Sequence, residues 1–252
     1  MSMQQVIEMF RGFGLRGMAR VLEDLQMNPA AQSLPREDML RNMLLAETHD
    51  RDDKRVKRLI KTAKFKVQAE PEDIDYRENR SLDREVIGNL LACEWITRAQ
   101  NALLTGLTGV GKTWMGCALG MQACRKLIPV RYFRLSRLLE SIEIARGDGS
   151  LPRLRGQITR TPLLILDDWG LTPLTAKGRH DLLELIDDRS GEGSVLITSQ
   201  LPVDKWYDWL GEPTVADAIL DRLVHSAHRI EFAGESMRKK RAESAKPTRN
   251  AA

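Results

Sequence analysis

The sequence is poor in the residues and runs that mark secreted, membrane-spanning or zinc-binding proteins. Its 252 residues include three cysteines and four histidines, and none of them falls at the spacing of a metal site. Because Cys93, Cys117 and Cys124 are odd in number, we expect buried, reduced thiols in place of disulfides. No apolar run approaches the roughly 18 residues that a membrane span requires, and the first residues lack the basic and apolar regions of a signal peptide. These absences predict a cytoplasmic protein that does not enter a membrane.

One stretch carries the clearest chemical signal, because a short apolar run from Asn101 leads into a complete G-x-x-x-x-G-K-T motif that ends at Thr113. Glycines allow the backbone of such a loop to curl, so that its N–H groups point at phosphate oxygens where a helix begins. Lys112 would place a cation at the β- and γ-phosphates of ATP, and the Thr113 hydroxyl would be a ligand of Mg²⁺. A glycine-rich turn that binds nothing is the alternative, but such a turn needs neither the lysine nor the hydroxyl. The predicted nucleotide-binding residues are Gly106, Leu107, Thr108, Gly109, Val110, Gly111, Lys112, Thr113 and Trp114.

A second apolar run, from Leu163 to Leu166, is too short for a helix and is typical of a strand buried on both faces. It ends in two adjacent carboxylates, Asp167 and Asp168, as a Walker B strand does. Asp167 would hold Mg²⁺, and Asp168 would orient or deprotonate the water that attacks the γ-phosphate. Because P-loop ATPases more often have glutamate in the second place, the shorter aspartate predicts slow intrinsic hydrolysis. A strand that simply ends in an Asp-Asp turn is the alternative.

Two further positions are candidates for catalysis. Gln200 follows a predicted strand at 194–199, where a polar group can contact the γ-phosphate or its water. Arg222 lies near the end of a predicted helix, where an arginine can reach the nucleotide of a neighbouring subunit and stabilise charge in the transition state. The alternatives are a capping loop for Gln200 and a surface salt bridge for Arg222.

Basic residues are concentrated between Arg51 and Lys66, where eight lysines and arginines stand against two aspartates. Helical spacing places an apolar stripe on one side of this segment and directs the basic side chains outward, towards the phosphates of a bound DNA. A solvated helix face that binds nothing is the alternative. The DNA-binding candidates are Lys54, Lys57, Arg58, Lys61 and Lys64 in this helix, with Arg153, Arg155 and Arg160 before the Walker B strand as a second surface.

Hydrophobic periodicity divides the chain into a small helical domain, a linker and an α/β core. The predicted boundaries are 1–66 for the helical domain, 67–82 for an extended linker, 83–234 for the ATPase domain and 235–252 for a basic tail that we expect to be disordered. Within the core, strands are predicted at 101–105, 129–134, 163–167, 194–199 and 227–232, and helices at 84–98, 112–126, 136–146, 175–190, 203–209 and 214–224. Strands that alternate with helices imply a parallel sheet with right-handed crossovers.

The chain as a whole resembles the IstB-like ATP-binding proteins encoded by bacterial insertion sequences, a branch of the AAA+ ATPases close to the helicase loader DnaC and the initiator DnaA. The resemblance is carried by the phosphate loop and by segments 15–22, 82–83, 163–170, 197–202 and 218–223. It implies an α/β P-loop NTPase fold of the AAA+ type, with Gln200 as the first sensor and Arg222 as an arginine finger supplied to a neighbouring subunit. It also implies that the helical domain binds DNA and docks a partner. The sequence departs from related loaders, which often have asparagine at the sensor position, and after Arg222 it is too short for a separate helical lid.

The sequence therefore predicts an ATPase that helps a transposase. Its subunits would form a homo-oligomer on double-stranded DNA, with ATP and Mg²⁺ at their interfaces, and would deliver a target to the cognate transposase. The runner-up is a DnaC-like loader of a replicative helicase. A small-molecule P-loop kinase, with an acceptor pocket and a lid whose arginines act within one subunit, is the third alternative.

Overall fold

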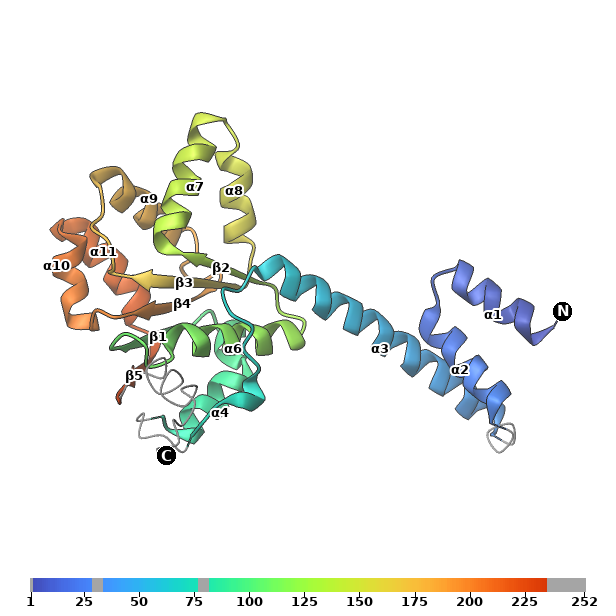
Figure 1. Ribbon diagram of the computed structural model, residues 1–252. Helices are drawn as coiled ribbons and strands as arrows, with labels where there is room; N and C mark the ends of the chain where they lie inside the picture. The colour runs from blue at the N-terminus through green and yellow to red at the C-terminus, as the bar shows by residue number, and fades with distance from the viewer. Residues whose placement is uncertain (1, 29–33, 77–81, 235–252) are drawn as a thin grey trace, which may run out of the picture. The chain divides into compact units, whose positions relative to one another are not determined.

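The computed structural model describes residues 2–28, 34–76 and 82–234. Its residues form two compact units, Met1–Arg58 and Leu59–Ala252 (Figure 1). Part of the predicted linker, 77–81, and the predicted basic tail, 235–252, lie outside the described residues. Within the described ranges, no helix is both long and apolar enough to cross a membrane.

The described part of the first unit is built from helices. Its elements are α1 (Met3–Gly12), α2 (Arg16–Met27) and the larger part of α3 (Arg36–Ala63). Its small core consists of Ile7, Ala19, Leu22 and Met43. α2 approaches α3 so closely at Gly17 that an added Cβ would lie 2.3 Å from the carbonyl oxygen of Ala46. Close packing therefore requires a glycine there, and the Gly17 N–H also donates to the buried Glu47 carboxylate at 2.9 Å.

The second unit is built on a five-stranded, all-parallel sheet with the strand order β2-β3-β4-β1-β5. The strands are β1 (Asn101–Gly106), β2 (Val130–Arg134), β3 (Leu163–Trp169), β4 (Ser194–Ser199) and β5 (Ala227–Phe232). The helices are α4 (Arg84–Ala92), α5 (Glu94–Thr97), α6 (Lys112–Arg125), α7 (Leu135–Gly147), α8 (Leu151–Thr159), α9 (Ala176–Asp187), α10 (Trp206–Leu210) and α11 (Pro213–Val224), with 3-10 turns η2 (Pro71–Asp73) and η3 (Val203–Lys205). Helical crossovers join the parallel strands, which confirms the predicted fold class.

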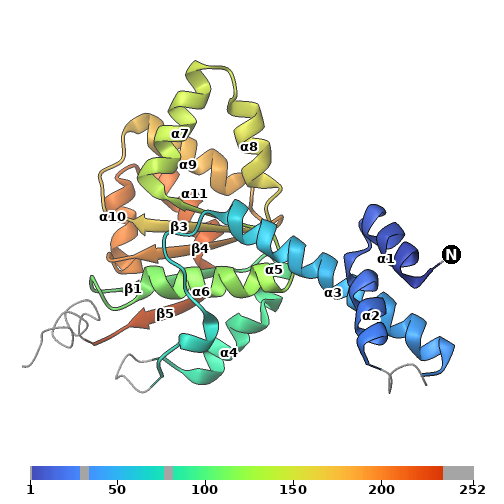
Figure 2. The ribbon, with the colours of Figure 1, turned by 45° about the vertical axis from the view of Figure 1, so that its right-hand side comes forward.

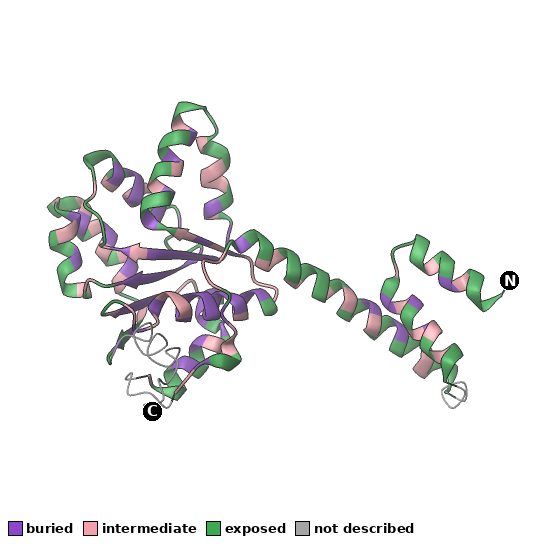
Figure 3. Cartoon of the chain, in the orientation of Figure 1, coloured by how far each residue is buried: buried purple, intermediate pink, exposed green. Residues whose placement is uncertain are grey.

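Hydrophobic side chains cover both faces of this sheet. Along β1, Ala102 and Leu104 belong to the core on the α6 face, whereas Leu103 belongs to the core on the α7 face. Successive side chains of a strand point to opposite faces, so a strand covered on both sides needs an unbroken apolar run. Figures 1 and 2 show α6 on one face and α7 with α8 on the other. Figure 3 shows buried residues concentrated in the inner strands β3, β4 and β1, whereas the edge strands β2 and β5 are only partly buried.

Two parts of the second unit differ from the expectation drawn from the sequence. The single helix predicted at 84–98 is interrupted at Cys93. The backbone of this residue has a φ of 63°, which ends α4 before α5 begins. α8 has no counterpart among the predicted helices, because a proline and a glycine interrupt its apolar pattern. The proline falls in the first turn of α8, where the missing N–H does no harm.

The segment that follows α3 is packed against the second unit up to residue 76. Ala69 and Ile74 are buried in the core on the α6 face, and Pro71–Asp73 form the turn η2. The two glutamates of this segment pair with Arg125 near the end of α6. The described part of the predicted linker is therefore packed into the second unit.

Candidate nucleotide site

The predicted phosphate loop connects the end of β1 to the start of α6. Gly106, Gly109 and Gly111 have φ values of 139°, 84° and 104°, which residues other than glycine rarely adopt. An added Cβ at Gly106 would also lie 2.4 Å from the carbonyl oxygen of Phe232 in β5. Lys112 is buried and donates to the carbonyl oxygens of Gly106 and Leu107, both at 2.6 Å. The loop is thus a curled segment at a helix N-terminus, which suits an anion.

Asp167 is the fully buried carboxylate at the centre of the site. It accepts hydrogen bonds from the Thr113 hydroxyl at 2.7 Å and from the hydroxyls of Thr198 and Tyr132. Burial acts to raise the pKa of Asp167, but these three hydroxyls and the Lys66 ammonium outweigh it and hold the pKa below its ordinary value. Burial and the neighbouring carboxylate raise the pKa of Tyr132, which keeps its proton for donation. Asp167 is therefore an anion fixed against the first turn of α6.

Asp168 shares the site because β3 contains an irregularity. Leu166 pairs with Ile197 of β4 and Trp169 pairs with Ser199, so β3 has one residue more than its partner here. Asp168 has a φ of 61° at this bulge. Adjacent strand residues normally point to opposite faces, and bulges re-aim side chains beside functional sites.

The bulge brings the carboxylates of Asp167 and Asp168 to one place. The Lys66 ammonium lies 3.3 Å from Oδ2 of Asp167 and 3.8 Å from Oδ2 of Asp168. The Arg134 guanidinium lies 3.6 Å from the same Asp168 oxygen. Two cations therefore face the acidic pair.

A cavity of about 1070 Å³ opens in front of these groups. Sequence-predicted residues on its wall are Thr108, Gly109, Gly111, Lys112, Thr113, Trp114, Asp168 and Gln200. The wall also includes residues that were not predicted, among them Lys66, Ile74, Tyr76, Arg84, Arg134 and Thr198. The structure therefore brings the two predicted motifs and Gln200 to one hollow that suits a ligand of nucleotide size.

Sequence reasoning missed the hydroxyl partners of Asp167 and the wall contributed by the predicted linker. Tyr132 and Thr198 are polar side chains in otherwise apolar strands, and that contrast is the available signal. In the acidic linker, the isolated apolar residues Ile74 and Tyr76 carry a comparable signal, since Ile74 is buried. Neither pattern identifies the partner across the fold, because the partners lie far away in the sequence.

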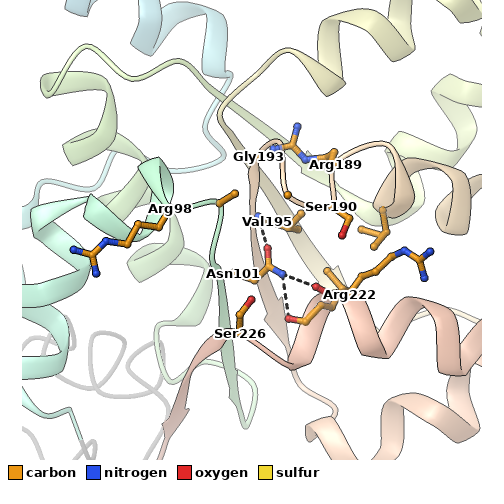
Figure 4. Close-up of a pocket in the computed structure, with 12 residues that line it drawn as sticks. Arg98, Asn101, Arg189, Ser190, Gly193, Val195, Arg222 and Ser226 are labelled. Atoms are coloured by element: carbon orange, nitrogen blue, oxygen red, sulfur yellow. Dashed lines mark hydrogen bonds between the residues drawn. The ribbon is translucent and has the colours of Figure 1, made fainter.

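Arg222 lies at the opposite end of the sheet from the phosphate loop, beside a second, smaller cavity (Figure 4). The Asn101 amide donates to the carbonyl oxygens of Arg222 at 3.0 Å and Leu223 at 3.2 Å, and its oxygen accepts from the Val195 N–H at 2.9 Å. Figure 4 shows the guanidinium of Arg222 pointing away from Asn101. This guanidinium pairs with Asp187 of α9 at 2.6 Å. Because Asn101 begins β1 and the loop follows its end, Arg222 is about 16 Å of strand away from its own phosphate loop.

The candidate DNA-binding residues fall into separate places. Lys54, Lys57 and Arg58 in the first unit, and Lys61 and Lys64 in the second, have exposed side chains. Lys54 pairs with Asp50 one turn earlier. On α8, Arg153 is exposed and Arg155 is half-buried, and Arg155 pairs with Glu184. Arg160, at the end of α8, is exposed.

The three cysteines are free and buried, as the sequence predicts. Burial raises the pKa of Cys93 and Cys117 to about 11 and that of Cys124 to about 12, so each thiol stays protonated at neutral pH. Among the described residues, no group of three or more His, Cys, Asp or Glu side chains could hold a metal ion.

The donor set at the phosphate loop fits Mg²⁺ bound together with a nucleotide. Mg²⁺ in phosphate-transferring sites is held by one or two protein oxygens plus phosphate and water, not by a complete protein cage. The Thr113 hydroxyl and a fully buried, anionic Asp167 supply such a partial set, 2.7 Å from each other.

The fold and the site define a P-loop protein of the AAA+ type. Solved structures agree with this class. The DnaC helicase loader matches with a TM-score of 0.56 and 18% identity, over 66% of this chain and 97% of that one. The AMPPCP-bound DnaA of Aquifex aeolicus matches with a TM-score of 0.57 and 15% identity, over 72% of this chain and 56% of that one. At these identities the likeness concerns the fold.

Sequence comparisons define the family. The model of the IstB-like ATP binding protein family matches residues 9–245. A protein of Sinorhizobium fredii named as insertion sequence ATP-binding protein y4pL is 47% identical over 90% of this chain and 92% of its own length. A Pseudomonas fluorescens protein named as an ATP-binding protein of insertion sequence IS1162 is 49% identical over 80% of this chain and 88% of its own length. This chain belongs to the IstB-like ATP binding protein family.

Proposed function

We propose that this protein hydrolyses ATP, assembles on double-stranded DNA and assists the transposase of an insertion sequence. The observation that carries the proposal is the meeting of the phosphate loop, the Thr113–Asp167 pair and Asp168 around one cavity. Names of its relatives connect the family to insertion sequences, and a mobile element of this kind needs a transposase to move. The nucleotide site and the client are thus supported by different evidence.

Each residue of the site has a defined part in the proposed reaction. Lys112 would exchange its two carbonyl partners in the loop for the β- and γ-phosphate oxygens. Thr113 and Asp167 would hold Mg²⁺, which neutralises phosphate charge when it is bound. Asp168, whose side chain is 25% exposed and lies on the cavity wall, would orient the attacking water. Gln200 is an exposed residue of the same wall and would contact the γ-phosphate.

Arg222 would act on the nucleotide of a neighbouring subunit. Its distance from its own phosphate loop argues against a role within one subunit. Its side chain is 31% exposed, and its guanidinium donates to Asp187 and to the carbonyl oxygen of Ala218 at 2.8 Å. The guanidinium would therefore be held in place at the surface for a neighbouring subunit. An arginine supplied across an interface stabilises charge in the transition state. Binding of ATP between subunits would then stabilise the assembly, and hydrolysis would weaken it.

DNA would bind through phosphate contacts. The exposed lysines of α3 and the basic residues of α8 are the supporting observations. Arg155 is the weakest of these candidates, because it is half-buried and already pairs with Glu184. A protein that neutralises phosphates in this way binds DNA with little sequence preference and with strong salt dependence.

A loader of a replicative helicase remains the second candidate, since the ATPase fold is like that of the DnaC loader. The two candidates share the ATPase and differ in the client. Affinity capture with the full chain, ATP and DNA should recover the transposase encoded by the same insertion sequence. Recovery of a replicative helicase without the transposase would favour the loader. A small-molecule kinase is disfavoured, because relatives of this chain are named for insertion sequences.

Two variants test the nucleotide site. Lys112→Ala should abolish ATP-dependent assembly on DNA, because the phosphates lose their cation. Asp168→Asn should bind ATP and assemble but fail to turn over, which leaves over-stable complexes. Assembly is measured by sedimentation on duplex DNA and turnover by phosphate release, with Lys126→Ala at the far end of α6 as a control for the loss of a lysine. Wild-type assembly and hydrolysis in both variants would contradict the site assignment.

A further inference from the structure

The Lys66 side chain occupies a position that the proposed chemistry does not use. Its ammonium lies 3.3 Å from Asp167 Oδ2 and 3.8 Å from Asp168 Oδ2. The side chain is 24% exposed, whereas Asp167 is fully buried. One lysine therefore lies within ion-pair distance of both carboxylates of the Walker B strand, although it precedes Asp167 by 101 residues in the sequence.

The backbone around Lys66 is fixed on α6. Phe65 packs so close to Gly120 that an added Cβ there would lie 2.6 Å from the Phe65 ring. The backbone N–H groups of Val67 and Lys66 lie against the Cys117 thiol and act to lower its pKa. Thr113, Cys117 and Gly120 are separated by four and three residues, so they share one face of α6. The segment thus follows the face of α6 that carries Thr113, and this path leads the Lys66 side chain to Asp167.

Lys66 also stands next to the end of the long helix α3. α3 ends at Ala63, and Lys64 has a φ of 56° directly after it. Two residues separate the last helical residue from Lys66. A change at the Lys66 ammonium therefore acts on the short stretch that leaves α3.

We propose that Lys66 is an internal counter-ion of Asp167 and Asp168 that Mg²⁺ displaces when it enters with ATP, so that nucleotide binding changes the chain segment next to α3. The inference rests on the proposed function, because it requires Asp167 to be a magnesium ligand. Two cations cannot share the same carboxylate at close range without repulsion. Asp167 already accepts from Thr113 and Thr198 on Oδ1 and from Tyr132 on Oδ2. The ammonium is the partner of Asp167 that carries charge, and it is the one that a divalent ion would replace.

The first test measures a divalent ion on the full chain without nucleotide. Mn²⁺ is the probe, and its free concentration is followed by its paramagnetic resonance signal. Lys66→Met keeps the apolar stem and removes the competing charge, so Mn²⁺ affinity should rise by about tenfold or more, which equals about 1.4 kcal/mol. Lys126→Met removes the same charge at the other end of α6 and should leave the affinity unchanged. In Lys66→Met combined with Asp167→Asn, the gain should disappear.

The second test follows Lys66 itself in the wild-type chain. Amine labelling read by mass spectrometry should modify Lys66 at least about threefold faster after Mg²⁺ and a non-hydrolysable ATP analogue are added, because the ion pairs are lost. Unchanged labelling would overturn the proposal. Slower labelling would overturn it as well, since Lys66 would then be a phosphate ligand.

The two tests separate this proposal from the proposed function. Binding of a fluorescent ATP analogue to the wild-type chain is measured in parallel. If the analogue does not bind, the proposed ATPase function fails, and the Mn²⁺ titration alone decides on Lys66. If the analogue binds while Lys66→Met has the Mn²⁺ affinity of the wild type, only the role of Lys66 fails.

Discussion

Tyr132→Phe isolates one hydrogen bond to the buried carboxylate of the nucleotide site. The Tyr132 hydroxyl donates to Asp167, and neither side chain is accessible enough for water to replace the bond. A hydrogen bond to a charged group contributes about 1.5–3 kcal/mol, and a buried acceptor that loses its donor keeps its desolvation cost. We therefore expect Tyr132→Phe to lower the free energy of unfolding of the second unit by about 2 kcal/mol. In a domain of this size, the midpoint of thermal unfolding should fall by about 4–8 °C.

The pH dependence of this loss follows from the lowered pKa of Asp167. A carboxylate with a depressed folded-state pKa contributes stability above its unfolded-state pKa and loses it as pH falls through the folded-state pKa. The ordinary pKa of an aspartate side chain is 3.8, so the penalty of Tyr132→Phe should be constant between about pH 8 and pH 5. Differential scanning calorimetry across this range tests it, with the more exposed Tyr207→Phe as the matched control. A penalty no larger than that of Tyr207→Phe, or one that shrinks between pH 8 and pH 6, would refute the reasoning.

Two further predictions concern assembly and DNA. Arg222→Ala should bind ATP but lose DNA-stimulated hydrolysis. Mixing it with Lys112→Ala should restore part of the activity, because one variant supplies an intact phosphate loop and the other an intact arginine. If no ratio of the two variants restores activity, Arg222 has a structural role. If the basic helix neutralises about four phosphates, the slope of log K against log salt should be about −3 to −4, and a triple alanine variant of its lysines should flatten that slope by about two to three units. An unchanged slope in binding titrations on scrambled duplexes would show that this helix face is solvated and does not bind DNA. The lysines replaced are Lys57, Lys61 and Lys64.

The parts of the fold that could be predicted are those with local signals. The phosphate loop is a contiguous motif whose glycine conformations are required by its own geometry, as the φ values of Gly109 and Gly111 confirm. The inner strands β3 and β4 were predictable because a strand covered on both faces needs an unbroken apolar run, and the first four residues of β3 are apolar and buried. Loop, strand and helix follow one another in the chain, so their chemistry can be read in sequence order.

The parts that could not be predicted depend on partners distant in sequence. Nothing near Lys66 indicates that its ammonium meets Asp167, because 101 residues separate them. The bulge that turns Asp168 into the cavity is a mismatch between β3 and β4, and a mismatch is a property of two strands together. The same holds for Tyr132, whose role appears only when β2 lies beside β3. Side-chain chemistry is thus readable from sequence, whereas the assembly of a buried polar network is not.

One strand connects the two ends of the proposed composite site. Asn101 begins β1 and binds the carbonyl oxygens of Arg222 and Leu223, while Gly106 ends β1 and starts the phosphate loop. β1 lies inside the sheet and is paired along its length with β4 and β5, so it moves as a rigid element and not as a flexible chain. A shift of the loop on binding a nucleotide would therefore be transmitted along β1 to the last turn of α11. Rigid, packed elements can carry energetic coupling between sites, and β1 is such an element between the proposed nucleotide loop and Arg222, the proposed arginine finger for a neighbouring subunit.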